Sequence, residues 1–116
     1  METTRSTSFE RFAGSCAIFV GVVGFCYSVA FIVVARRLPE VGSLLSALFL
    51  MLGGLLAPPV LVAIYYRLRT TDAGFALWAL LLGILGAFGA AVHGGYELAN
   101  AINPPLGPAG RSAQPD

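Results

Sequence analysis

Three long stretches of the chain consist mainly of apolar residues and contain no Asp, Glu, Lys or Arg. They run from Ala13 to Ala35, from about Val41 to Tyr66 and from about Ala73 to Tyr96. A helix that crosses a bilayer needs roughly 20 predominantly apolar residues, and each stretch is long enough. A water-soluble three-helix bundle would instead show a polar face with a period of 3.6 residues. The pattern therefore predicts an all-α fold, a three-helix transmembrane bundle with short loops.

Capping signals mark where these helices begin. Thr7 and Glu10 have the spacing of a capping box, in which each residue satisfies an amide of the other. Pro39 suits the first turn of the second helix, where no intrahelical donor is lost. Thr71 or Asp72 can cap the third helix. We expect helices at about residues 9–36, 40–67 and 72–101, in a single transmembrane domain of residues 1–102.

The two ends of the chain differ from its apolar part. The first apolar stretch is longer than the 7–15 residues typical of a signal-peptide core, so we expect it to remain as a span. Residues 103–116 are rich in Pro and Gly, which is typical of segments without a packed core. We predict that they form a disordered tail.

Composition narrows the class of protein further. Hydrophobic residues make up 57% of the 116 residues and charged residues 11%, with a formal net charge of +1. The chain offers no basic surface for a nucleic-acid backbone, so nucleic-acid binding is excluded. The chain contains Arg but no Lys. This choice of residue, together with the abundant Ala and Gly, is typical of a bacterium with a GC-rich genome. We expect a multi-pass protein of the bacterial inner (plasma) membrane, in contact with the lipid bilayer.

The arginines favour one orientation by a single residue. The positive-inside rule acts through an excess of Arg and Lys near helix ends on the cytoplasmic side. With the N-terminus inside, the chain has four arginines on the inner side and three on the outer side, so this orientation is expected. The inner set is Arg5, Arg11, Arg67 and Arg69, and the outer set is Arg36, Arg37 and Arg111.

Small residues recur every four positions along the third apolar stretch, as Gly83, Ala87, Ala91 and Gly95. Lipid tails are as apolar as Leu, so helices in a membrane associate where small residues let their backbones approach. We predict that this face packs against another helix and that the third helix is the central element. The pattern leaves open whether the partner is in this chain, in a second copy or in another membrane protein. The alternative is that Gly and Ala are simply frequent in the chain.

Two adjacent prolines interrupt the second apolar stretch. Pro58 and Pro59 each remove an intrahelical donor, which frees the carbonyls of Gly54 and Leu55 and predicts a kink. Two interpretations remain open. The kink is either a static bend that fits the bundle, or a hinge or ligand-facing carbonyl site.

A polar cluster lies near the end of the third stretch. Its members share one stripe of a helix, and they are His93, Tyr96, Glu97 and Asn100. Upstream on this face, Gly86 and Gly89 would leave a gap above the imidazole. Counting about 20 residues from Phe75 puts His93 close to the membrane interface and Glu97 at or beyond it.

Two interpretations of this cluster follow. One is an ordinary solvated helix end, where an i,i+4 pair adds about 0.3–0.5 kcal/mol. The other is a site for a proton, a cation, a quinone or a small ligand, since ionisable groups at membrane depth usually have a role.

The sequence gives little support for a haem site, a metal site, a disulfide or a catalytic site. His93 is the only His, so a monomer cannot supply two His ligands to a haem, and no HxxxH, HExxH or CxxC spacing occurs. Cys16 and Cys26 lie ten residues apart on one helix, too far for a disulfide with each other. No nucleophile has a base and a third group at a recognisable spacing. We expect no cofactor, no metal site and no enzymatic activity.

The run from His93 to Pro105, with the Gly/Ala-rich helix before it, resembles uncharacterised bacterial multi-pass membrane proteins of unknown function. The resemblance implies no activity. Proteins of that kind continue into further helices after the Pro-Pro, which raises the alternative that this chain is a truncated product or a half that assembles with another.

Two functions are therefore expected. The first is a structural or accessory membrane subunit that associates through the small-residue face of the third helix. The alternative is a homo-oligomeric proton- or cation-coupled small transporter, or a lipid- or quinone-binding protein, that uses His93 and Glu97.

Overall fold

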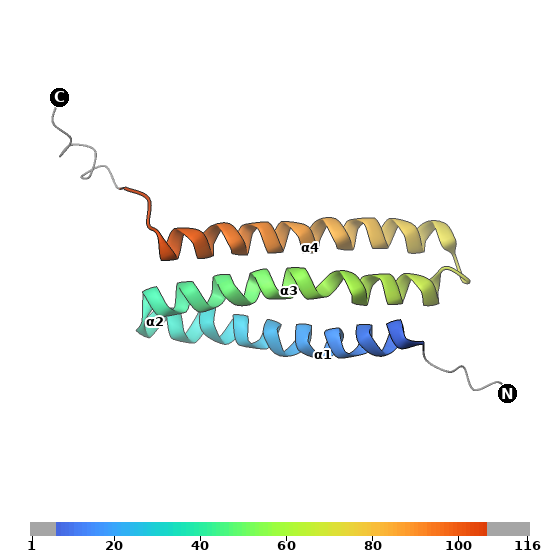
Figure 1. Cartoon of the computed structure of the whole chain (residues 1–116), viewed down its shortest axis with the longest axis horizontal. Coiled ribbons are helices and arrows are strands. Elements are labelled where there is room, and N and C mark those ends of the chain that lie inside the picture. Colours follow the sequence, from blue (N-terminus) through green and yellow to red (C-terminus); the bar gives the residue numbers. More distant parts are fainter. Residues whose placement is uncertain (1–6, 107–116) are drawn as a thin grey trace, which may run out of the picture.

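The computed structural model describes residues 7–106 and shows three long antiparallel helical segments (Figure 1). The first consists of α1 (Ser8–Val29), a π-helical turn η1 (Ala30–Val34) and the short α2 (Ala35–Arg37). The second is α3 (Pro39–Leu68) and the third is α4 (Ala73–Ile102). Each segment has 30 residues and is apolar enough to cross a membrane. The predicted all-α fold with three helices long and apolar enough to span a membrane is confirmed. Of the predicted tail, residues 107–116 lie outside the described residues.

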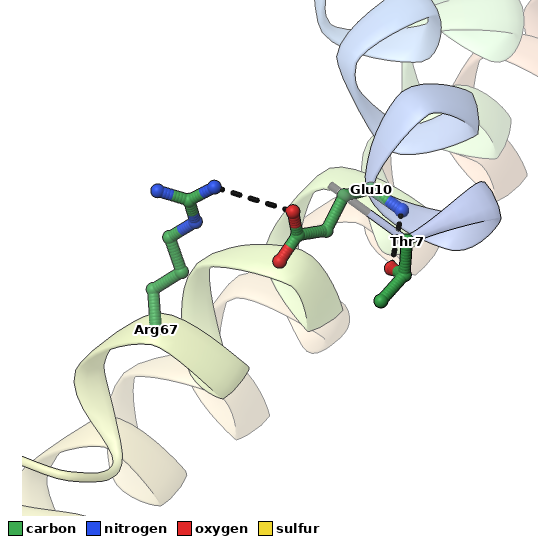
Figure 2. A network of polar contacts seen from close by, with 3 residues as sticks. All are labelled: Thr7, Glu10 and Arg67. Carbon is green, nitrogen blue, oxygen red and sulfur yellow. Dashed lines mark hydrogen bonds and ion pairs between the residues drawn. The ribbon is translucent and has the colours of Figure 1, made fainter. Parts of the chain in front are cut away.

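Side-chain caps start the two outer helices. Thr7 Oγ1 accepts from the Glu10 amide at 3.2 Å, and Asp72 Oδ1 accepts from the Phe75 amide at 3.1 Å. The capping box is only half formed, because the Glu10 carboxylate pairs with Arg67 at 3.3 Å (Figure 2). This ion pair joins the first turn of α1 to the last turn of α3.

The middle helix of the chain is also the middle helix of the fold. Among the described helices, α3 packs against both α1 and α4, whereas α1 and α4 do not pack against each other (Figure 1). The expectation that the third helix is central is therefore wrong. The three helices form a single layer in which spatial order follows chain order.

Close backbone approach joins α3 to α4. A Cβ added at Gly54 would collide with the backbone of Ala87 and Ala91, and one added at Gly94 would collide with the backbone of Met51. A side chain larger than hydrogen at either glycine would therefore push the two helices apart. The seam depends on small residues on both sides.

The four-residue repeat of α4 lies in this seam only in part. Gly83 contacts the Leu61 side chain and Ala87 is buried. Ala79 and Ala99, which extend the four-residue spacing by one step in each direction to six residues, are exposed. Each four-residue step turns about 40° around an α-helix, so six members cannot share one face. The face formed by Gly83, Ala87, Ala91 and Gly95 turns toward α3 of the same chain.

The prolines do not end the second helix. Its helical hydrogen-bonding pattern continues through Pro58 and Pro59 to Leu68. Gly54, whose carbonyl loses its usual donor at Pro58, is also one of the points where the backbones of α3 and α4 come close. The predicted kink and its two interpretations remain predictions.

Candidate functional site

Charged side chains bound the layer at both ends. Between them lies a region in which α1 and α3 have no charged side chain, and we call this region the charge-free slab. One row consists of Glu10, Arg11, Arg67, Arg69 and Asp72, and the other of Arg36, Arg37 and Glu40. Within the slab, His93 and Glu97 of α4 are the only residues of the types Asp, Glu, Arg, Lys and His. The slab therefore contains a single ionisable pair of these types.

The contacts between α3 and α4 fix the position of this pair along α3. Gly94 lies against Ala47 and Met51 of α3, and Gly83 lies against Leu61. The two helices are antiparallel, so these contacts show which residue of α3 lies level with each residue of α4. In this register His93 is level with about residue 50 of α3 and Glu97 with about residue 46.

The level of the pair on α3 gives a second estimate of its depth. The charge-free part of α3 is about 39 Å long, and a hydrocarbon core of about 30 Å centred on it begins near Leu44. Glu97 then lies about 4 Å and His93 about 10 Å inside that boundary. The count along α4 began at Phe75, which is level with the end of α3 beyond Arg67, and therefore gives a shallower position.

The two side chains meet each other and are otherwise open. His93 Nε2 lies 3.1 Å from Glu97 Oε1, with 64% of the His93 side chain and 45% of the Glu97 side chain exposed. Neither Tyr96 nor Asn100 makes a side-chain hydrogen bond to the pair among the described residues. The structure thus brings together two members of the predicted cluster.

An apolar groove lies beside the pair. It has a volume of about 340 Å³ and is lined by α1, α3 and α4 near the middle of the slab. The side of the layer on which it opens is called the groove face, and it includes Gly24, Tyr27, Gly53, Ala57, Gly86 and Ala90. His93 follows Ala90 by three residues and Gly86 by seven, so it lies on the same side of α4, just past the groove.

The groove face is rich in positions without neighbours. A Cβ added at Gly24 or Gly86 would meet no atom within 4 Å. An open pair of ionisable side chains at this depth would face lipid in a single copy, which is costly. The arrangement therefore suits a surface covered by protein or reached by water.

Sequence reasoning missed the groove and the π-helical turn. The turn at Ala30–Val34 ends with the Ala35 amide donating to the Ala30 carbonyl, and it contains neither Gly nor Pro. No local signal in an AFIVV run distinguishes it from ordinary helix. The groove depends on contacts among three helices, which an apolar sequence pattern does not specify.

Metal-ligating side chains do not gather in the described part of the chain. No group of three or more His, Cys, Asp or Glu residues that could hold a metal ion occurs there. Cys16 is buried, Cys26 is half-buried, and both thiols are free. The His93–Glu97 pair is therefore the candidate site on which a function can be argued.

Comparisons with protein-family profiles, with curated protein sequences and with solved structures find no match to this chain. Function is accordingly inferred from the geometry of the layer and its ionisable pair.

Proposed function

We propose that the protein is a structural or accessory subunit of the bacterial plasma membrane that works as a homo-oligomer, with the groove face as its contact surface. The observation that carries the proposal is the exposure of His93 and Glu97 inside the charge-free slab. Polar side chains in membrane helices nearly always face a protein interior or a water-filled cavity. A covering subunit would supply that environment.

A second copy is the partner that best fits the pair. A two-fold axis along the membrane normal keeps equal residues at equal depth, and with the axis beside α4 each pair would face the pair of the other copy. Each copy would then offer carboxylate acceptors and an imidazole to the other. A partner of different sequence would need its own polar groups at the same depth.

Open small residues on the same face also support the proposal. Gly24 and Gly86 leave space on α1 and α4, so the backbone of a docking helix could come close. The face first expected to mediate association, with Gly83, Ala87, Ala91 and Gly95, is instead turned toward α3 within the chain. The contact surface is therefore moved around α4 to the side that carries His93.

Cysteine cross-linking in lipid tests the interface. In a chain with Cys16→Ala and Cys26→Ala, Gly86→Cys is expected to give a disulfide-linked dimer under mild oxidation. Phe88→Cys is the matched control, because Phe88 is exposed at nearly the same depth on the other flank of α4. Efficient linking at Phe88 and none at Gly86 would contradict the proposal, as would a monomer in lipid at every protein density.

A second candidate function follows from the depth of the pair. A proton- or cation-coupled transporter, or a lipid- or quinone-binding protein, would use His93 and Glu97 as its polar site in the membrane. Flux assays in proteoliposomes test this function with Glu97→Gln and His93→Ala. Equal proton and cation fluxes, and equal ligand binding, in all three proteins would leave the structural role alone.

A further inference from the structure

A second hollow lies at the opposite side of the layer, at the end where α1 begins and α3 ends. It has a volume of about 630 Å³. Its polar lining comes from Thr7, Glu10 and Arg69, and its apolar lining includes Phe9, Val62 and Tyr66. Val62, Tyr66 and Arg69 lie on the other side of α3 from Gly53 and Ala57, so this hollow is separate from the groove face.

Among the polar groups that line this hollow, one positive charge, that of Arg69, has no ion-pair partner in the described residues. The Glu10 carboxylate is paired with Arg67 (Figure 2), so its charge is already compensated. The Arg69 guanidinium lies 4.7 Å from the centre of the Tyr66 ring and has no ion-pair partner among residues 7–106. The Thr7 hydroxyl accepts from the Glu10 amide and keeps its own proton to donate. The open groups therefore favour an anion.

The apolar part of the hollow points to an amphiphile. Arg69 directly follows α3 in the bounding row of charges, whereas Val62 lies seven residues earlier, about 10 Å deeper in the slab. An occupant that matches this order has an anionic head at Arg69 and a hydrocarbon chain along Val62. Tyr66 between them has both a ring for the chain and a hydroxyl for the head, as is usual at a membrane interface.

We propose that this hollow, the Arg69 site, binds the headgroup of an anionic phospholipid, with its phosphate on the Arg69 guanidinium and its first acyl carbons on Val62 and Phe9. Arg suits a phosphate because its planar fork donates two parallel hydrogen bonds. The site does not depend on the proposed oligomer, because it opens on the other side of the layer.

Native mass spectrometry of the full chain tests the Arg69 site with phosphatidylglycerol as the probe. Arg69→Gln is expected to weaken phosphatidylglycerol binding about tenfold, the scale of a charge-assisted hydrogen bond pair. Arg36→Gln is the matched control, since Arg36 is an exposed arginine in the opposite row of charges, and it is expected to leave the affinity of this site unchanged. Arg69→Lys should retain part of the binding.

Two further measurements distinguish a lipid headgroup from free phosphate as the ligand of Arg69. Phosphatidylcholine, whose headgroup has no net charge, is expected to bind less tightly than phosphatidylglycerol, and millimolar inorganic phosphate is expected not to displace the lipid. Displacement by inorganic phosphate would overturn the lipid assignment in favour of a simple phosphate site. Equal losses in Arg69→Gln and Arg36→Gln, with unchanged helix content by circular dichroism, would overturn the site itself.

Discussion

The glycines of the layer lie against a neighbouring helix in one region and are open in another. In the α3–α4 seam, Gly54 and Gly94 lie where the neighbouring backbone leaves no room for a Cβ. In α1, a Cβ added at Gly14, Gly21 or Gly24 would meet nothing within 4 Å. A glycine in a membrane helix therefore contributes to packing only where the register brings another backbone opposite it.

Side chains rather than backbones hold much of the α1–α3 seam. Ala13 and Cys16 are buried, and a Val23 methyl lies 3.7 Å from the position that a Cβ on Gly53 would take. The Glu10–Arg67 ion pair adds a polar contact at one end. Where α2 meets the start of α3, however, Gly42 comes as close to the Ala35 backbone as the α3–α4 glycines do to theirs.

The largest expected effect breaks the α3–α4 seam. Gly54→Leu should lower the free energy of unfolding by about 3 kcal/mol or more, because the new side chain must displace the backbone of α4. Gly21→Leu in α1 is the control, and it should change the free energy by less than about 0.5 kcal/mol. Denaturation titrations in mixed micelles measure both. Equal effects would mean that the glycine packed against α4 and the open glycine of α1 do not differ as described.

A smaller effect is expected at the caps that start the two outer helices. Asp72→Ala should lower the free energy of unfolding by about 1 kcal/mol, because the Phe75 amide loses its acceptor at the start of α4. Hydrogen exchange at the first turn of α4 should accelerate, while the first turn of α1 keeps its rate. Thr7→Ala is the reciprocal control and should accelerate exchange in α1 alone. Acceleration in both helices from either substitution would show that the seams are energetically coupled.

The smallest effect concerns the ion pair at the α1–α3 seam. Arg67→Gln should lower the free energy of unfolding by less than about 1 kcal/mol, since 72% of the Arg67 side chain is exposed and exposed pairs contribute little. A double-mutant cycle with Glu10→Gln measures the interaction itself, which should weaken as salt is raised. A coupling energy above about 2 kcal/mol would place the pair in a drier environment than its exposure indicates.

Much of the fold was predictable because length and apolar composition decide what can cross a bilayer. The helix starts at Thr7 and Asp72 followed from cap chemistry that is local in sequence. The order and register of the helices did not follow. A helix that is apolar on all sides has no hydrophobic stripe to show which side meets its neighbour, so α3 was not recognised as central.

The candidate pair shows the same limit. That His93 and Glu97 would meet was predictable, because residues four apart on a helix are neighbours. Their level relative to α3 was not, because it depends on which residues of α3 lie opposite Gly94. Counting from Phe75 within α4 alone had no means of detecting that α4 begins outside the charge-free slab.

The central position of α3 also has a consequence for biogenesis. Each seam joins two helices that are consecutive in the chain and linked by a short turn, so every packing contact between the described long helices is made by neighbours in chain order (Figure 1). During synthesis, α1 and α3 can pair as a hairpin as soon as both are in the bilayer, before α4 has been made. The last helix then adds to one edge of a surface that already exists. Such an assembly proceeds in order along the chain, without requiring an early helix to wait for a distant partner.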